Sequence, residues 1–150
     1  MSTGRAVVVL DTERTAPVDI HTCYSAIAKY RQAIAVDPRF APAYNNRGVA
    51  LANKHAYDGA IIKYQQAIAI DPKFEAAYYN WGNALVDEHK YDAAISKYSQ
   101  AIAINPTDAQ AYYNWGSVLA DQHDYAGALV KYEQAIAIDP KLRLPAGLPP

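Results

Sequence analysis

A segment of 34 residues repeats three times without insertion or deletion, and this repetition constrains the fold more than any other feature of the chain. The copies occupy residues 41–74, 75–108 and 109–142, and residues 26–40 repeat the second half of the same segment. A repeat of this length buries its hydrophobic face on its neighbours rather than in a separate core. The periodicity therefore predicts a linear stack of similar units.

Each repeat has the hydrophobic spacing of two helices joined by a short turn. Tyr44, Gly48 and Leu51 lie four and three residues apart, which follows one face of a helix and not the alternation of a strand. Residues 54–56 separate this helix from a second one. The second helix is expected to end near Asp71, because a residue before proline is displaced from the α region. The same proline signal recurs at Pro38, Pro106 and Pro140.

A glycine stands in the middle of each first helix, where it costs ~1 kcal/mol relative to alanine. These glycines are Gly48, Gly82 and Gly116. The repeated cost predicts a close contact with the second helix of the same repeat. We expect an alanine to face each glycine and a tyrosine to fill the space beside the contact. The alanines are Ala60, Ala94 and Ala128, and the tyrosines are Tyr64, Tyr98 and Tyr132.

These residues resemble the tetratricopeptide repeat, whose pattern is W-x2-L-G-x2-Y, then A-x3-F, then P. The corresponding residues are Tyr78, Trp81, Gly82, Leu85, Ala94, Tyr98 and Pro106 in the middle repeat, with Tyr44, Arg47, Gly48, Leu51, Ala60, Tyr64 and Pro72 before it and Tyr112, Trp115, Gly116, Leu119, Ala128, Tyr132 and Pro140 after it. Tyr takes the place of the usual Trp, and Trp81 and Trp115 take the place of the usual Leu. Arg47 departs from the pattern, so the first repeat is expected to have a weaker core or a capped outer edge.

The resemblance implies an all-α fold, a right-handed superhelical stack of antiparallel helix pairs. Residues 21–142 would form the repeat domain, with 21–40 as a partial repeat. Residues 1–20 would be an irregular arm or a degenerate half-repeat, and 143–150 a flexible tail. Asp19 and Thr22 are alternative caps for a helix ending near Val36. First helices would line a concave groove, where such proteins, mostly adaptors, bind peptides or partner proteins.

The groove face of the first helices carries a row of polar residues that the fold does not require. Asn46, Asn80 and Asn114 recur once per repeat, and an asparagine offers both a donor and an acceptor to a peptide unit. Asp87 and Asp121 follow in the last turn, where they would favour a basic-leaning ligand. The candidate peptide-binding residues are Asn45, Asn46, Asn53, Tyr79, Asn80, Asn83, Asp87, Tyr113, Asn114, Ser117 and Asp121.

Two alternatives to ligand binding remain open for these residues. The asparagines are either solvated or bonded between neighbouring repeats, and the aspartates are either ligands for a cation or ordinary surface charge. The predicted groove face has no Lys or Arg, so we expect no binding of the acidic tails that chaperone-binding relatives hold.

The histidines and lysines of the repeats favour structural roles. His21, His55, His89 and His123 lie one repeat apart, and stacked repeats hold equivalent residues too far apart to share a metal ion. We expect these histidines to end helices in the left-handed conformation, and no metal or cofactor to bind. Lys29, Lys63, Lys97 and Lys131 are expected on a solvated outer face. No nucleophile has a local base, so the chain is not expected to be an enzyme.

A second hypothesis concerns the ends of the stack, which need polar caps. The second helix of the last repeat should expose Leu129, Ile136 and Ile138, and burying such side chains is worth ~1.5–3 kcal/mol each. The tail leucines Leu142, Leu144 and Leu148 would fold back over this end, or residues 7–10 would cover an end. Otherwise two chains would meet there, which predicts a self-assembling scaffold and a homo-oligomer.

Composition excludes several classes of partner. The chain has a formal net charge of −1 and no block of Lys or Arg, so we expect no nucleic acid partner. A single cysteine, Cys23, excludes an internal disulfide and fits a reducing compartment. No stretch approaches the ~18 apolar residues of a membrane span, and residues 6–10 are too short for a signal peptide. The expected location is the cytoplasm.

Overall fold

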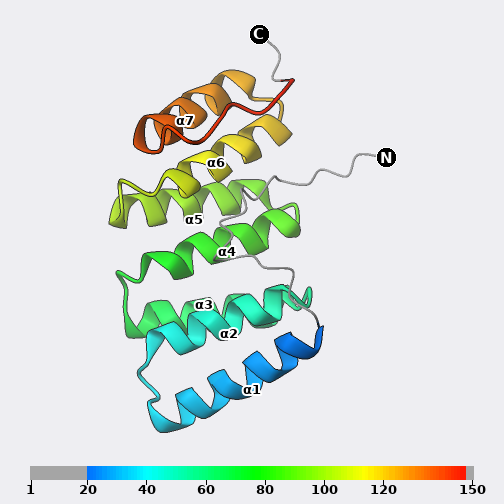
Figure 1. The fold of residues 1–150 in the computed structure, drawn as a ribbon, viewed down its shortest axis with the longest axis vertical. Coiled ribbons are helices and arrows are strands. Elements are labelled where there is room, and N and C mark those ends of the chain that lie inside the picture. Colours follow the sequence, from blue (N-terminus) through cyan, green and yellow to red (C-terminus); the bar gives the residue numbers. More distant parts are fainter. Residues whose placement is uncertain (1–19, 148–150) are drawn as a thin grey trace.

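The computed structural model describes residues 20–147, and these residues form seven helices (Figure 1). The helices are α1 (Ile20–Val36), α2 (Ala41–Ala52), α3 (Tyr57–Ile70), α4 (Glu75–Asp87), α5 (Tyr91–Ile104), α6 (Ala109–Asp121) and α7 (Tyr125–Ile138). The predictions made for residues 1–19 and for Leu148 lie outside the described residues. Thr22 is not a cap, because α1 is already helical at Ile20.

Each full repeat forms one antiparallel helix pair, so α2 pairs with α3, α4 with α5 and α6 with α7, while α1 is a second helix (Figure 1). The predicted proline signals mark the ends of the second helices. Asp71, Asn105 and Asp139 are extended, and each donates its backbone N–H to the last turn of the helix before it. The all-α solenoid predicted from the sequence is confirmed.

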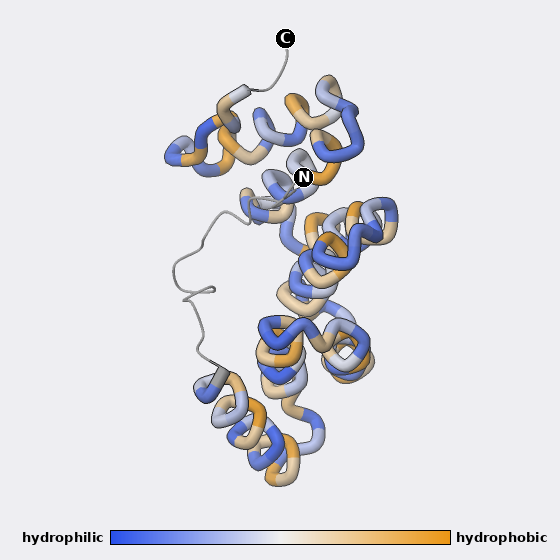
Figure 2. Tube along the Cα trace, turned by 90° about the vertical axis from the view of Figure 1, so that its right-hand side faces the viewer, coloured by the Kyte–Doolittle hydropathy of each residue, from blue (hydrophilic) through white to orange (hydrophobic). Residues whose placement is uncertain are grey.

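The stack bends into an arc, with alternating polar and apolar residues along each helix (Figure 2). Side-chain hydrogen bonds join the first helices of neighbouring repeats, α2 to α4 and α4 to α6. The helices α2 and α4 also contact each other directly, whereas within the described residues no comparable contact joins the second helices α3 and α5. The first helices therefore lie on the inner side of the arc, where neighbouring repeats approach most closely.

The mid-helix glycines allow a tyrosine ring to lie directly on the first helix. A Cβ atom placed on Gly82 would lie 2.6 Å from Cε1 of Tyr98, and one on Gly48 would lie 2.5 Å from Cε1 of Tyr64. Gly116 is related in the same way to Tyr132, at 2.9 Å. These distances are shorter than van der Waals contact. The closest neighbour of each glycine is thus the tyrosine, where we expected the facing alanine.

Three histidines end the first-helix turns in the left-handed conformation, as predicted. Their φ angles are 59° at His55, 59° at His89 and 65° at His123. Each also contacts the tyrosine two residues later, and the distance from Nδ1 to the tyrosine hydroxyl is 2.7, 3.0 and 2.9 Å, respectively. His21 does not share this role, because it lies inside α1.

The lysines of the second helices are not simply solvated. The Nζ atoms of Lys97 and Lys131 each lie 3.9 Å from the centroid of a tryptophan ring, that of Trp81 and Trp115 respectively, a cation–π geometry. In the first repeat the tryptophan position is Arg47. There the pKa of Lys63 is lowered, first by burial and then by the positive charge of Arg47. In the first repeat, repulsion between Lys63 and Arg47 therefore takes the place of the attraction between lysine and tryptophan in the later repeats.

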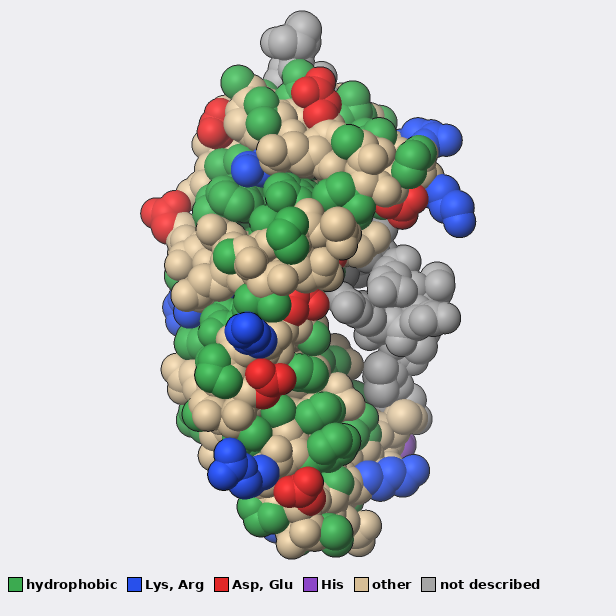
Figure 3. All heavy atoms as spheres, turned by 90° about the vertical axis from the view of Figure 1, so that its left-hand side faces the viewer, with side chains coloured by type: hydrophobic (Ala, Val, Ile, Leu, Met, Phe, Trp, Pro, Cys, Tyr) green, Lys and Arg blue, Asp and Glu red, His purple; other side chains and the backbone are tan. Residues whose placement is uncertain are grey.

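Acidic and basic side chains are interspersed on the edge of the stack that carries the proline turns (Figure 3). Among the residues placed there, Arg39 and Lys73 each donate a backbone N–H to a nearby carboxylate, that of Asp37 and Asp71 respectively. This edge shows no field of a single sign that would attract a polyanion.

Candidate functional site

The inner face between α2 and α4 holds a chain of three asparagines. The Nδ2 of Asn80 donates to Oδ1 of Asn45 at 3.1 Å, one repeat back, and the Nδ2 of Asn45 donates to Oδ1 of Asn46 at 3.1 Å. Asn45 is only 5% exposed, whereas Asn46 is exposed and Asn80 is half-buried. The row predicted from the sequence therefore includes a hydrogen-bonded bridge between two repeats.

The equivalent interface between α4 and α6 is closed. The Nδ2 of Asn114 donates to the hydroxyl of Tyr79 at 3.0 Å and to Oδ1 of Asn83 at 3.1 Å. Asn83 also accepts from the hydroxyl of Tyr98 at 2.7 Å, and Asn114 is 4% exposed. Asn114 is therefore bonded between neighbouring repeats, which was the alternative to ligand binding.

Five of the eleven predicted peptide-binding residues are buried, which corrects the expectation that they face a ligand. They are Asn45, Tyr79, Tyr113, Asn114 and Ser117. Ser117 donates to the carbonyl of Tyr113 and accepts from the hydroxyl of Tyr132. Most of their polar atoms are bonded within the protein, because an unpaired polar group is costly to bury. Oδ1 of Asn114 is the exception, buried without a partner among the described residues. The residues exposed in the structure are Asn46, Asn53, Asp87 and Asp121, with Asn80 and Asn83 half-buried.

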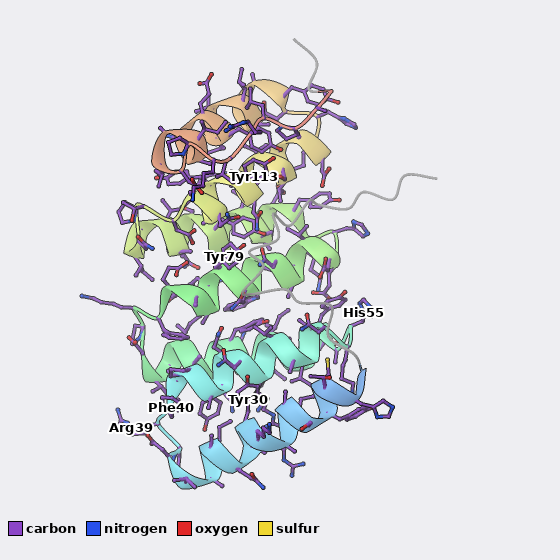
Figure 4. All side chains as sticks on the ribbon, viewed as in Figure 1. Tyr30, Arg39, Phe40, His55, Tyr79 and Tyr113 are labelled. Atoms are coloured by element: carbon purple, nitrogen blue, oxygen red, sulfur yellow. The ribbon has the colours of Figure 1, made fainter. Side chains whose placement is uncertain are left out.

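One position explains why the two interfaces differ. Tyr79 and Tyr113 occupy the same place in successive repeats, one above the other on α4 and α6 (Figure 4), and they are 2% and 6% exposed. The first repeat has Asn45 at this position, and the smaller side chain leaves a cavity of ≈ 440 Å³ beside it. Tyr30 and Phe74 also line this cavity. The prediction from sequence missed both, although the change from tyrosine to asparagine at position 45 was visible.

The two aspartates at the ends of α4 and α6 lie in a row with the turn histidines. Burial of the carboxyl group raises the pKa of Asp87, against the opposing effects of His55 and His89 and of a hydrogen bond from Tyr57. The pKa of Asp121 is raised by burial as well, against the effects of the neighbouring histidines. Both carboxylates also oppose the helix dipole, because they stand in a last turn. Ionised aspartate is therefore unfavourable at both positions.

Replacing Asp87 by asparagine is expected to stabilise the protein at neutral pH by about 0.3–1 kcal/mol, the usual size of a helix-dipole effect. A pKa raised on folding means that the stability from this group is present at low pH and is lost as the pH rises through the folded pKa. The gain should therefore shrink as the pH falls through the raised folded pKa of Asp87, because the carboxylate then takes up its proton. Urea unfolding at pH 7 and pH 3 measures both values.

The matched control for this measurement is Asp92→Asn. Asp92 stands in the first turn of α5, where a carboxylate stabilises the helix, and it accepts a hydrogen bond from Gln122. This variant should lose stability at pH 7. A loss of stability in Asp87→Asn as well would contradict the electrostatic argument.

The α7 end of the stack is partly covered by the segment that follows it. Leu142 is 8% exposed and packs in the cluster of Tyr113 and Tyr132, and the hydroxyl of Tyr113 donates to the backbone carbonyl of Arg143 at 3.1 Å. Leu142 therefore folds back as expected, whereas Leu144 is 47% exposed.

The predicted oligomer-interface residues divide between the surface and the core. Leu129 and Ile138 are 40% and 37% exposed, but Ile136 packs against the same cluster as Leu142 and is corrected to a partly buried core residue. The residue equivalent to Leu129 one repeat earlier, Ile95, is half-buried because the next repeat packs on it.

The described residues also bear on metal binding and on membrane insertion. Within residues 20–147, no group of three or more His, Cys, Asp or Glu side chains is placed to hold a metal ion. None of the helices in the same range is long and apolar enough to span a bilayer.

Several solved structures are similar in fold to this chain. A crystal structure of MamA is 27% identical, with a TM-score of 0.71, and the match covers 93% of this chain and 76% of MamA. A second MamA crystal structure gives 26% identity and a TM-score of 0.72, covering 85% and 72% of the two chains. The TPR domain of Arabidopsis OM64 is 18% identical with a TM-score of 0.66, covering 69% and 85%, and shows the fold alone. No curated protein sequence matches.

Family models match most of the described helices. The TPR repeat model matches residues 25–55, 56–88 and 82–123, and the tetratricopeptide repeat model matches 109–142. The matched residues include the glycine–tyrosine contacts and the asparagine bridges described above. The chain therefore belongs to the tetratricopeptide repeat family, whose members are all-α solenoids and typically serve as protein-interaction modules.

Proposed function

We propose that this protein is a non-enzymatic interaction module that binds an extended, basic-leaning peptide or the corresponding segment of a partner protein on the inner face of its stack. The observation that carries the proposal is the pair of aspartates Asp87 and Asp121, which lie at the surface with partly buried carboxyl groups, so that the pKa of each is raised and its charge is less favourable than in the unfolded chain. A ligand with Lys or Arg would relieve this cost by pairing with them.

Asparagine side chains on the same face supply the polar contacts. Asn46 is exposed on α2, Asn53 is exposed directly after the end of α2, and Asn80 is half-buried on α4. Each amide can donate to and accept from a peptide, with a net gain of about 0.5–1.5 kcal/mol per hydrogen bond. Affinity from these groups alone is modest, so charge pairing and apolar contacts must contribute.

An array of extended peptides, half of them rich in Lys and Arg and half in Asp and Glu, tests this proposal. We expect binding of the basic set only, with affinity that falls as salt is added, because exposed charge pairs are screened. The variant Asp87→Asn/Asp121→Asn should weaken the same peptides by roughly tenfold, from about 0.7 kcal/mol per lost pair.

The matched control is Gln65→Ala, which changes an exposed side chain on the second helix α3. It should bind the basic peptides as the unchanged protein does. Tight binding of peptides with acidic C-terminal ends would contradict the proposal, as would basic-peptide binding that is unchanged in the double variant.

A second candidate function is self-assembly through the α7 end of the stack. The observation that favours it is the exposure of neighbouring apolar side chains on α7, 40% at Leu129 and 51% at Val130. Light scattering at several concentrations would show an oligomer that Leu129→Glu converts to a monomer. A protein that stays monomeric at every concentration would rule out this candidate, and the peptide experiment would be unaffected.

A further inference from the structure

The inner face holds a cavity beside Asn45. Its volume is ≈ 440 Å³, within the range of small-ligand pockets. It lies at the meeting of α1, α2 and α4, and both polar and apolar side chains line it. The lining residues used in the argument are Tyr30, Asn45, Asn46, Val49, Phe74 and Asn80. In Figure 4, Tyr30 lies between α1 and α2.

The cavity exists because two positions lack the residues or partners that fill them elsewhere in the stack. Asn45 takes the place of the bulky Tyr79 and Tyr113, both buried. Tyr30 is the counterpart of Tyr64, which is 1% exposed beneath its glycine, but Tyr30 is only half-buried. Tyr30, which stands at a core position of the repeat, and Asn45, which replaces a larger tyrosine, thus border the same cavity.

The hydrogen-bonded series of three asparagines has one unpaired donor and one unpaired acceptor at this cavity. Asn45 links the other two amides, since it accepts from Nδ2 of Asn80 and donates to Oδ1 of Asn46. Within residues 20–147, the Nδ2 of Asn46 and the Oδ1 of Asn80 then have no hydrogen-bond partner, although both residues line the cavity. A donor and an acceptor held by one rigid bridge form a fixed recognition pair.

We propose that this cavity binds a primary carboxamide, the side chain of a glutamine or asparagine of the partner segment. The ligand's carbonyl oxygen would accept from Nδ2 of Asn46, and its NH₂ group would donate to Oδ1 of Asn80. A carboxylate would leave the Asn80 oxygen facing a negative charge, and an ammonium group would leave the Asn46 amide without an acceptor. This inference rests on the proposal that the inner face binds peptides.

A side-chain carboxamide fits the observations better than a peptide backbone. A backbone lying along the groove needs an open amide in each successive repeat. In the α4–α6 interface the Nδ2 of Asn114 is already bonded to Tyr79 and Asn83, and the residue is 4% exposed. An open pair confined to one position selects a single side chain, while Tyr30, Val49 and Phe74 provide apolar contact for its methylene groups.

The probe for this site is N-acetyl-glutamine-N-methylamide, titrated into the ¹⁵N-labelled full chain. The corresponding glutamate, methionine and alanine compounds serve as comparisons, and the alanine compound carries the same backbone amides without the side-chain amide. We expect the glutamine compound to shift the side-chain NH₂ signals of Asn46 and Asn80. Its affinity should exceed that of the other three by about tenfold, the effect of one or two hydrogen bonds.

Two variants test the assignment. Asn45→Tyr restores the residue of the other two repeats and should fill the cavity, abolishing the shifts without loss of helix content, because Tyr79 already accepts from an asparagine in this arrangement. Asn46→Asp replaces the open donor by an acceptor and should also abolish binding, which keeps the test valid if the first variant is unstable. Gln65→Ala should leave the titration unchanged.

Three results would overturn the inference: equal affinity for the alanine compound, preference for the glutamate compound, or no change in the Asn46 and Asn80 signals with any compound. Basic peptides that bind equally well with a glutamine and with an alanine at the same position, compared in pairs added to the array, would keep the proposed function and reject this subsite. Glutamine-compound binding with no peptide binding on the array would reject the proposed function and keep the subsite.

Discussion

Replacing Tyr98 by alanine is expected to lower the free energy of unfolding by about 3–5 kcal/mol, the cost of removing a large aromatic side chain from a packed core. Tyr98 is 1% exposed, its ring lies on Gly82, and its hydroxyl donates to Oδ1 of Asn83 at 2.7 Å. It also packs beside Tyr79, with 6.1 Å between the ring centroids. The substitution therefore opens a cavity in the middle repeat and frees an asparagine that bridges two repeats.

Urea unfolding followed by circular dichroism measures this loss, and tryptophan fluorescence shows whether the repeats of Trp81 and Trp115 unfold together. The matched control is Tyr98→Phe, which keeps the ring and removes only the hydroxyl. It should cost about 0.5–1.5 kcal/mol, because Asn83 still accepts from Asn114. Equal losses in the two variants would show that the hydroxyl, and not the packing of the ring, carries the stability.

Replacing Gly82 by alanine is expected to destabilise the protein by about 1–3 kcal/mol, although alanine is the better helix former. The new Cβ would lie 2.6 Å from Cε1 of Tyr98 and 2.8 Å from its Cδ1, and the ring is buried with little room to move. Overpacking therefore outweighs the ~1 kcal/mol that a glycine-to-alanine change gains in a helix. The urea midpoint at constant slope gives the difference directly.

Gly59→Ala is the control for this prediction, because the sign of the effect should reverse. Gly59 lies in α3, and a Cβ there meets only Cδ1 of Leu51, at 3.6 Å. With ordinary contact and no clash, the variant should gain up to about 1 kcal/mol from helix propensity. Stabilisation by both substitutions would contradict the view that the mid-helix glycine exists to admit the tyrosine ring.

Helix boundaries and turn conformations followed closely from the sequence, because they depend on local chemistry. Proline after Asp71 predicted the end of α3, and the period of the repeat predicted the pairing of helices. The left-handed turns at His55, His89 and His123 also followed from the residue type and its position after a helix. The role of the lysines could not be predicted from the sequence. The stacking of Lys97 on Trp81 depends on which faces of two helices meet.

The candidate site could be predicted only in part. The sequence placed Asn46, Asn80 and Asn114 on one face, but three residues in register say nothing about which of their amide atoms remain open. That depends on the neighbouring repeat: Asn114 meets Tyr79, whereas Asn80 meets Asn45. The cavity beside Asn45 is likewise a property of two adjacent helices and of α1, and a single repeat does not contain it.

The sequence by itself determined the period, the helix pairs, the close packing at each mid-helix glycine and the residues left over on the inner face. These features follow from spacing and steric size within 34 residues. Tertiary structure alone decided that Asn114 and Tyr79 are bonded to each other between repeats and that Tyr113 is buried beneath the segment after α7. It also decided that, within residues 20–147, an open donor and an open acceptor remain at Asn46 and Asn80. The physical reason is that hydrogen bonds between repeats join side chains about 35 positions apart, and their partners are fixed only when the helices stack.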